Sequence, residues 1–485
     1  MKKYILYICL LFVWVACSET VHIDKTVEEQ PSIFPDYAGV TIPSNIAPLN
    51  FALATDEKEA YAFFVVGENR FEVEAKDGKF IIPVSKWKKM LEAAVGNKVT
   101  VTVAVKRGEE WVGYAPFFLY VAKETMDPYL AYRLIDPGYV LWNQMGIYQR
   151  NLEGYSQSAI IENKSTHNNC VNCHSFCMQN PDKMLFHMRE KLPGTILVDG
   201  HKIEKLNTKT EQTISSLVYP SWHPSGRYVA FSVNNTKQAF HMNDKNRIEV
   251  YDEASDVVVY DVEKHEIVTA PVLFSSRSFE TFPTFSPDGK TLYFCSADAQ
   301  SMPESYNKLK YNLCSVSFNP DTRSFGAEVD TLYNVGTEGK SVSFPRVSPD
   351  GRYLLCTLSG YGNFSIWHKD ADLYLFDLQR KESRLLDEVN SDDVESYHSW
   401  SSNSHWFVFS SRRIDGLYTR PYFAYIDEEG KVGKPFLLPQ KDPDYYSLSM
   451  KSYNIPEFIK DKVKVRERVL SLKAKENKGI DVKFN

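Results

Sequence analysis

The chain lacks the short motifs that mark common catalytic sites. Its 485 residues contain no Gly-rich phosphate loop, no G-x-S-x-G nucleophile elbow and no H-E-x-x-H metal motif. The net charge is −6 and no basic stripe interrupts the acidic average, so we expect no nucleic-acid partner. A hydrophobic fraction of 43% with 24% charged residues indicates a soluble globular body. These absences favour a binding or electron-transfer protein over an enzyme.

Long hydrophobic runs are confined to the N-terminus, where MKKYILYICLLFVWVACSET predicts an export signal over residues 1–17. The apolar stretch is too short to span a bilayer comfortably. Ala16-Cys17 resembles a bacterial lipobox, which implies lipidation of Cys17, although Trp14 replaces the usual Leu; ordinary cleavage near Ala16 is the alternative. Residues 18–35 predict a polar tether. We therefore expect an outer-membrane lipoprotein of a bacterial cell envelope, held by its lipid and facing the periplasm or the cell surface.

The segment 36–125 predicts a small β-sandwich-like domain. VTVTVAVKRGEEWVGYAPFFLYVA alternates apolar and polar residues, and FEVEAKDGKFIIP is typical of a hairpin. One helix interrupts these strands, with Ser85 as its expected N-cap and Gly96 at its end. Its buried stripe is predicted to be Trp87, Met90, Leu91 and Ala94.

From about residue 210 the sequence repeats itself. Four units begin YPSWHPSGRYVAFSV, FPTFSPDGKTLYFCS, FPRVSPDGRYLLCTL and YHSWSSNSHWFVFSS, and hairpins such as SDVVVYDVEKHEI follow them. Four strands per unit of about 50 to 60 residues indicate propeller blades. The S-P-D-G start followed by the D-[IVL]-[YV]-x-x-D hairpin resembles the TolB-like β-propeller repeats of bacterial envelope proteins. The resemblance covers about 129–458 and is specific for fold but nearly silent on chemistry.

The repeat extends towards the N-terminus, because CHSFCMQNPDKMLFHM from Cys173 aligns with YPSWHPSGRYVAFSV. GYVLWNQMGIYQRNLEGYSQSAIIEN is a further blade or half-blade, and the segment from Tyr445 is expected to close the ring. The predicted fold is thus all-β: a six-bladed TolB-like propeller, with five or seven blades as alternatives, behind the β-sandwich-like domain. A basic tail, 459–485, is expected to be a solvated helix or coil.

Cysteine is scarce, with eight in the chain, yet three of them lie together as Cys170, Cys173 and Cys177. The first two belong to the pentapeptide CVNCH, residues 170–174. Covalent haem needs two thiols about one helical turn apart and an imidazole beneath the iron, and the C-x-x-C-H spacing supplies both. We therefore predict haem c on Cys170 and Cys173, with His174 as the proximal iron ligand. The motif is expected in the segment that leads into the innermost strand of a blade.

Three other interpretations of the motif stay open. In the first, Cys170 and Cys173 would form a structural disulfide in an oxidising envelope, with Cys177 as an alternative partner. In the second, His167, the two motif cysteines and either His174 or Cys177 would bind a tetrahedral zinc ion. The third interpretation is an unligated structural loop. No small helical cytochrome domain surrounds the motif.

Candidates for the sixth iron ligand are close in sequence. They are Met178, Met184 and Met188, with His167 and His187 as further options. Met184 and Met188 are expected on one face of a strand, with His187 on the other. Ordinary blade core is the competing interpretation of this run.

Two functional hypotheses follow. The first is a haem-carrying envelope lipoprotein that moves electrons or senses redox state, with the propeller as a docking platform. The second is a haem-free propeller scaffold that binds a protein, peptidoglycan or another glycan, with Cys170–Cys173 as a disulfide. An enzyme working in the propeller funnel is a weaker third option, since no catalytic set is identifiable.

Overall fold

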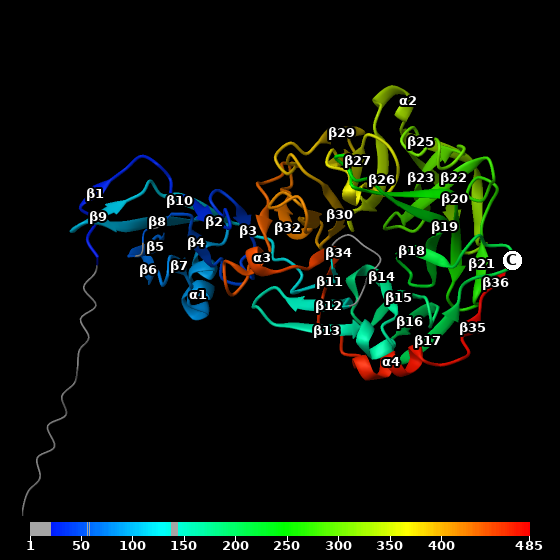
Figure 1. Ribbon diagram of the computed structural model, residues 1–485, viewed down its shortest axis with the longest axis horizontal. Coiled ribbons are helices and arrows are strands. Elements are labelled where there is room, and N and C mark those ends of the chain that lie inside the picture. Colours follow the sequence, from blue (N-terminus) through cyan, green and yellow to red (C-terminus); the bar gives the residue numbers. More distant parts are fainter. Residues whose placement is uncertain (1–20, 56, 58, 137–143) are drawn as a thin grey trace, which may run out of the picture.

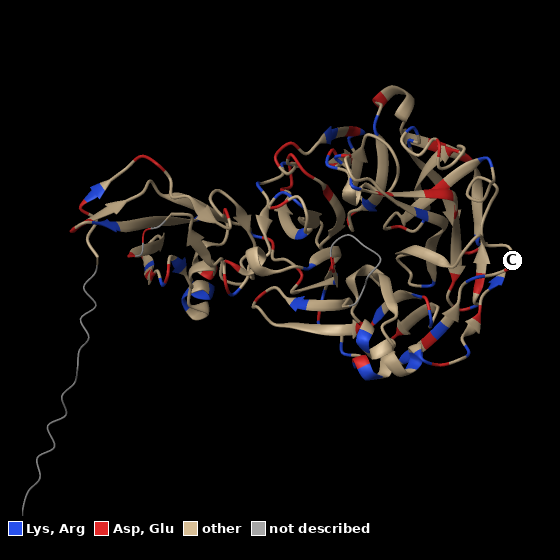
Figure 2. Cartoon of the chain, in the orientation of Figure 1, with Lys and Arg blue, Asp and Glu red and all other residues tan. Residues whose placement is uncertain are grey.

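The computed structural model describes residues 21–55, 57, 59–136 and 144–485 and consists mainly of short strands, as the all-β prediction requires. The export signal and Cys17 lie outside these residues. Figure 1 shows a small lobe, formed by the first part of the chain, beside a larger rounded lobe. Basic and acidic residues are interspersed over both lobes (Figure 2). Among the described residues, no helix is both long and apolar enough to cross a membrane.

Two sheets and one helix form the small lobe. The larger sheet has seven strands: β1 (Lys25–Thr26), β3 (Thr41–Ile42), β5 (Ala60–Val66), β6 (Asn69–Glu74), β8 (Lys98–Arg107), β9 (Glu110–Gly113) and β10 (Phe117–Val121). The smaller has three: β2 (Ile33–Phe34), β4 (Phe51–Leu53) and β7 (Lys79–Phe80). The helix α1 (Val84–Ala94) buries the four predicted stripe residues, but it begins directly after Pro83 without a side-chain cap. Ser85 therefore lies inside the first turn and is not the N-cap.

The expected tether, 18–35, belongs to this lobe from residue 25 onwards. Strand β1 pairs in parallel with β9, and β2 pairs with β4. Ile33 is buried in the core of the lobe. The polar composition of the segment concealed two short strands, because a strand of two residues is too short to show alternation.

Six sheets make up the larger lobe. The first contains β11 (Tyr129–Ile135), β12 (Gly146–Asn151), β13 (Gln157–Glu162) and the distant β34 (Ser452–Ile459). The second contains β14 (Cys170–Phe176), β15 (Lys183–Arg189), β16 (Gly194–Asp199), β17 (Lys202–Asn207) and β35 (Ile480–Asp481). The third contains β18 (Leu217–Trp222), β19 (Tyr228–Phe240), β20 (Ile248–Asp261), β21 (Glu266–Val268) and β36 (Lys483–Phe484).

The remaining three sheets each come from consecutive strands. They are β22 (Ser278–Phe285), β23 (Thr291–Asp298), β24 (Asn312–Asn319) and β25 (Ser324–Tyr333); β26 (Ser341–Val347), β27 (Tyr353–Ser359), β28 (Asp372–Asp377) and β29 (Glu382–Leu385); and β30 (Glu395–Trp400), β31 (Trp406–Ser411), β32 (Arg420–Tyr425) and β33 (Phe436–Leu437). The short helices are α2 (Val335–Glu338), α3 (Tyr445–Leu448) and α4 (Glu467–Ala474), with 3-10 turns at η1 (Asn163–Thr166), η2 (Cys177–Gln179) and η3 (Ser365–Trp367).

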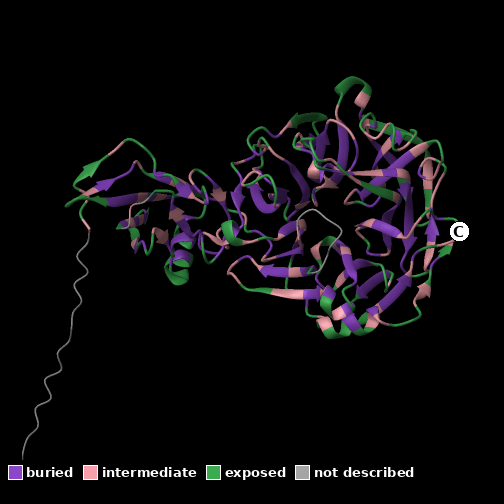
Figure 3. Cartoon of the chain, in the orientation of Figure 1, coloured by how far each residue is buried: buried purple, intermediate pink, exposed green. Residues whose placement is uncertain are grey.

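One strand of each sheet contacts its counterparts in the two neighbouring sheets. The contacts run β34, β14, β18, β22, β26, β30 and back to β34. These six inner strands therefore form a closed ring, and β34, from near the end of the chain, lies against β11 as expected of the closing segment. The strands of the ring are mostly buried and the connecting loops are mostly exposed (Figure 3).

The C-terminal segment is not a solvated tail. Helix α4 buries Leu470 and Ala474 in the core of the first two sheets. Strand β35 then pairs in parallel with β17, and β36 pairs in parallel with β21. The end of the chain thus covers the edges of two neighbouring sheets, which protects their unpaired main-chain groups.

The two lobes share one apolar core. Trp87 of α1 and Trp406 of β31 belong to the same buried cluster. Polar contacts reinforce the junction: Trp406 Nε1 donates to Glu124 O at 3.1 Å, and the main-chain N–H of Ser402 donates to Asp127 Oδ2 at 2.7 Å. The small lobe is therefore packed against the sixth sheet.

Candidate functional site on the axis of the ring

The CVNCH motif lies on β14, one of the six inner strands. Cys170, Cys173 and His174 are 5%, 2% and 3% exposed. The motif is thus part of the inner strand itself and not of a segment leading into it. It does not adopt the helical turn that the spacing suggested; a bulge at Cys173 and His174 interrupts the pairing of β14 with β15 instead.

Cys173 occupies a position that recurs in all six inner strands. Each of these strands has a register shift, and a residue with φ near +50° lies within it. The six residues are Cys173, Tyr219, Phe282, Phe344, Tyr397 and Ile455. The predicted alignment of Cys173 with Tyr219 is therefore confirmed. A positive φ is costly for bulky residues, so the ring of packed sheets must hold these residues in place.

The bulge residues meet at the centre of the ring of inner strands, here called the axis. The ring centroids of Tyr219 and Phe282 are 4.8 Å apart, those of Phe282 and Phe344 are 4.2 Å apart, and those of Phe344 and Tyr397 are 4.9 Å apart. Cys173 completes this set as a thiol where its counterparts carry mostly aromatic rings. The aromatic rings fill the centre of the molecule, and the void beside Cys173 and His174 is only about 30 Å³.

His174 is buried and has no hydrogen-bond partner of good geometry for either ring nitrogen among the described residues. Burial, together with the positive charge of Arg133, lowers the pKa of His174 to about 3, while a main-chain group of Ile455 acts weakly in the opposite direction. The imidazole is therefore neutral at neutral pH. A buried polar group without a partner is costly and needs an explanation.

Three arginines lie beside the residues that precede the bulges. Arg133 hydrogen-bonds to Asn172, and Arg189 pairs in register with Cys170. Arg412 lies over the ring of Trp367 at 3.5 Å, and burial lowers its pKa to about 9. The positive charges of all three arginines lower the pKa of Tyr397 at the axis, against the larger effect of burial, which raises it. This part of the axis is therefore rich in positive charge next to the two motif thiols.

A pocket of about 140 Å³, here called the axial pocket, is lined by bulge residues and by the residues that follow them. Trp222, Trp400 and several prolines form much of its wall, and His174 faces it as well. Its charged lining residues are Arg346 and Glu457. Burial raises the pKa of Glu457 to about 8, against the opposing effects of the Phe176 N–H and of Arg346.

The predicted iron ligands are distributed unevenly around this site. Met178 lies on η2 and lines the axial pocket together with His174. Met184 and Met188 lie on the apolar face of β15, both 1% exposed in the core beside the first sheet, so the blade-core interpretation holds for them. His187 Nδ1 contacts Thr195 Oγ1 at 3.2 Å. His167 is exposed beyond η1.

Cys170, Cys173 and Cys177 are free thiols that form no disulfide in the structure. No group of three or more His, Cys, Asp or Glu side chains among the described residues is placed to hold a metal ion, so the four-ligand zinc arrangement is not formed. Two free thiols and a buried imidazole on one strand are the donor types that a covalent haem uses, but Cys170 packs in the core of the first two sheets, whereas Cys173 and His174 line the axial void. The void at these residues is far smaller than a porphyrin, so the bound group would require a wider axis.

The sequence did not single out the arginines or Glu457. Arg346 follows the bulge in FPRVSPDG, where the other three repeat starts have Ser or Thr, and this departure was the available signal. Glu457 follows Ile455 and Pro456 in the closing strand as Arg346 follows Phe344 and Pro345, so it is a second departure at the same position. Arg133 and Arg189 come from strands outside the motif, so only the folded ring brings them to it.

No family model matches the chain, and no curated protein is similar to it in sequence. Among solved structures, a DUF4784 family protein from Bacteroides caccae is 7% identical, with 73% of this chain and 95% of that chain covered and a TM-score of 0.32. The tricorn protease is 12% identical over 85% of this chain and 36% of its own, with a TM-score of 0.36. A puromycin-hydrolysing peptidase of Mycobacterium tuberculosis is 12% identical over 86% of this chain and 57% of its own, also with a TM-score of 0.36. Similarity at this level does not bear on the function of this chain.

Proposed function

We propose that the six sheets are the blades of a TolB-like β-propeller and that the chain is a cell-envelope lipoprotein anchored through Cys17. Three observations support the propeller: the closed order of the inner strands, the six equivalent bulges, and a first sheet completed by β34 from near the C-terminus. Pairing β34 with β11 in one sheet closes such a ring of sheets. The lipoprotein part of the proposal rests on the sequence of residues 1–17 alone.

We further propose that the propeller carries haem c on Cys170 and Cys173, with His174 as the proximal ligand, for electron transfer or redox sensing. The observation that carries this proposal is the buried His174 imidazole, which lies beside Cys173 at the axis and forms no hydrogen bond of good geometry with a described residue. Bound haem would supply one-electron chemistry at the axis. Neutral imidazole is the form that coordinates iron, and Arg133 and Arg189 offer positive charge for the propionate groups.

The proposal makes a demand on folding. Because Cys170 and Cys173 are almost fully buried and the void beside them is small, haem must be attached before the inner strands close. Met178 is the methionine that shares the axial pocket with His174 and is the remaining methionine candidate for the sixth ligand.

An absorption spectrum tests the haem proposal. The protein is produced in cells with a working cytochrome c maturation system, denatured, and examined for colour that stays with the chain. We expect a reduced α-band that survives denaturation and is lost in Cys173→Ala. The matched control is Cys177→Ala, which removes a neighbouring buried thiol outside the motif and should keep the colour. A colourless wild-type chain under these conditions would contradict the proposal.

A second candidate function is a haem-free binding platform for an envelope protein, peptidoglycan or another glycan. The observation that favours it is the axial pocket itself, with aromatic walls and with Arg346 and Glu457 in its lining. In that case Cys170 and Cys173 would be a disulfide, which requires the two thiols to move together. Thiol labelling of the denatured chain separates the cases: two protected, reducible thiols support the platform, whereas two permanently blocked thiols support haem.

A further inference from the structure

Arg346 is a half-buried cation with few protein partners. Among the described residues, its side chain makes one hydrogen bond, from Nη1 to the Pro345 carbonyl oxygen at 3.1 Å. No carboxylate of the described chain lies within ion-pair distance of it. Burial lowers the pKa of Arg346, and the more distant Glu457 only partly opposes that effect. A guanidinium presents five N–H donors in a planar fork that matches a carboxylate, so most of its hydrogen-bonding capacity remains unused.

Glu457 is the second charged group in the lining of the pocket. Its Oε1 accepts the main-chain N–H of Phe176 at 2.9 Å, and Oε2 has no protein partner among the described residues. With a pKa of about 8, the side chain is a neutral acid at neutral pH and can donate from Oε2. A donor of this kind can share its proton with a second carboxylate, as closely spaced carboxyl groups do.

We propose that the axial pocket binds a small organic carboxylate, held by the guanidinium fork of Arg346 and the acid of Glu457. The inference rests on the binding-platform candidate, in which no haem occupies the axis. One cation and one neutral donor suit a monoanion, whereas a phosphate dianion would require more positive charge. Trp222, Trp400 and the prolines of the wall offer apolar contact to the organic part of the ligand. The carboxylate is either that of a free acid or the C-terminal group of a peptide chain.

Isothermal titration of the mature chain tests the proposal with acetate, acetamide and phosphate as probes. Acetate should bind, and acetamide, of similar shape but neutral, should bind at least about tenfold more weakly. Arg346→Gln should weaken acetate binding by at least about tenfold, because a charge-assisted contact is lost. Arg346→Lys keeps the charge but loses the planar fork, so its affinity for acetate should lie between those of wild type and Arg346→Gln. The matched control is Arg384→Gln, an exposed arginine paired with Glu388, which should leave binding unchanged.

Several results would overturn the carboxylate assignment. Equal binding of acetate and acetamide, phosphate binding as tight as acetate, or unchanged acetate binding in a folded Arg346→Gln variant would each do so. An acetylated dipeptide and its C-terminal amide separate the two sources, because only a chain-end ligand predicts that the free dipeptide binds more tightly than acetate. If no carboxylate binds but a partner is captured by wild type and Arg346→Gln alike, this inference fails and the platform stands. If acetate binds without any partner, the platform fails.

Discussion

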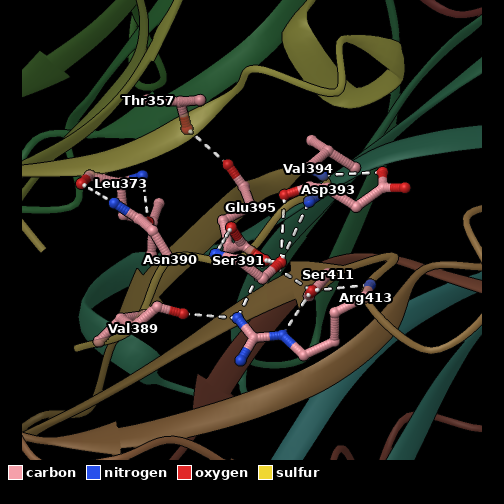
Figure 4. A network of polar contacts seen from close by, with 10 residues as sticks. All are labelled: Thr357, Leu373, Val389, Asn390, Ser391, Asp393, Val394, Glu395, Ser411 and Arg413. Carbon is pink, nitrogen blue, oxygen red and sulfur yellow. Dashed lines mark hydrogen bonds and ion pairs between the residues drawn. The ribbon is translucent and has the colours of Figure 1, made fainter. Parts of the chain in front are cut away.

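A buried ion pair within the sixth sheet joins the start of β30 to the segment after β31, and its disruption has a calculable cost (Figure 4). The Glu395 side chain is fully buried at the start of β30. Its Oε1 accepts from Arg413 Nη2 at 2.9 Å and from the hydroxyls of Ser391 and Ser411, each at 2.7 Å. Burial raises the pKa of Glu395, and the Arg413 charge and the serine hydrogen bonds partly offset that rise.

Arg413→Met leaves the carboxylate buried without its cation. Removing one partner of a buried pair costs about 3–5 kcal/mol, and we expect about 3 kcal/mol, because the Arg413 side chain is 21% exposed. Loss of the cation raises the pKa of folded Glu395 further. The unfolded carboxyl, by contrast, ionises near its ordinary value of 4.5. A raised folded pKa means that stability falls as pH rises above the unfolded value, so the loss should be larger at pH 8 than at pH 5.

Urea unfolding followed by tryptophan fluorescence at both pH values measures this loss. Adding Glu395→Gln to Arg413→Met should recover stability at pH 8, because no buried charge remains. The control is Arg384→Met, whose exposed pair with Glu388 should contribute less than about 1 kcal/mol. Equal losses for Arg413→Met and Arg384→Met, or a loss independent of pH, would refute the reasoning.

Three further outcomes are expected. Lys205 Nζ donates to the carbonyl oxygens of Ala474 and Glu476 at the end of α4, each at 2.9 Å. Lys205→Met should therefore lower the free energy of unfolding by about 2 kcal/mol and make α4 sensitive to limited proteolysis. The same sensitivity in Lys202→Met would contradict this. Because the folded pKa of Glu457 is about 8 against an ordinary 4.5, this side chain should lower the stability in urea as pH rises from 4.5 to 8. Glu457→Gln should therefore lose less stability than wild type over this range, and an identical pH dependence of the two would count against a neutral Glu457. Deletion of residues 475–485 uncovers the edges of β17 and β21. Light scattering should then detect association of the truncated chain that the full-length protein does not show. A monodisperse truncated chain would argue against an edge-covering role.

The repeats made the larger lobe predictable. Each unit encodes a strand, a Pro/Asp/Gly turn and further strands, and these local signals agree with the sheets observed. The alignment of Cys173 with Tyr219 also placed the motif correctly within its unit. The bulge itself was not predictable, because Tyr, Phe and Cys do not favour a positive φ. Tertiary packing, and not local preference, holds them there.

The site was predictable only in part. The spacing of CVNCH identified Cys170, Cys173 and His174, which share one strand at the axis. The methionines illustrate the limit, since Met178, Met184 and Met188 are equally close in sequence and only Met178 lines the axial pocket. Arg346 and Glu457 are brought together by the closing strand, so no local pattern contains both.

The termini were the least predictable part. Strands of two residues, such as Lys25–Thr26 and Lys483–Phe484, carry no periodic signal. Their polar and basic composition indicated solvated segments, yet main-chain pairing fixes them to sheet edges. Such pairing depends on the partner strand, which lies 87 residues or more away in the sequence.

The most direct test of the haem proposal is the intact mass of the denatured mature chain, made with cytochrome c maturation. If the axis carries haem c, wild type and Cys177→Ala should each be heavier by one haem than the polypeptide with its Cys17 lipid, and Cys173→Ala should not retain the group as wild type does. A wild-type mass equal to that of the lipidated polypeptide, or lower by two hydrogens for a disulfide, would contradict the haem account.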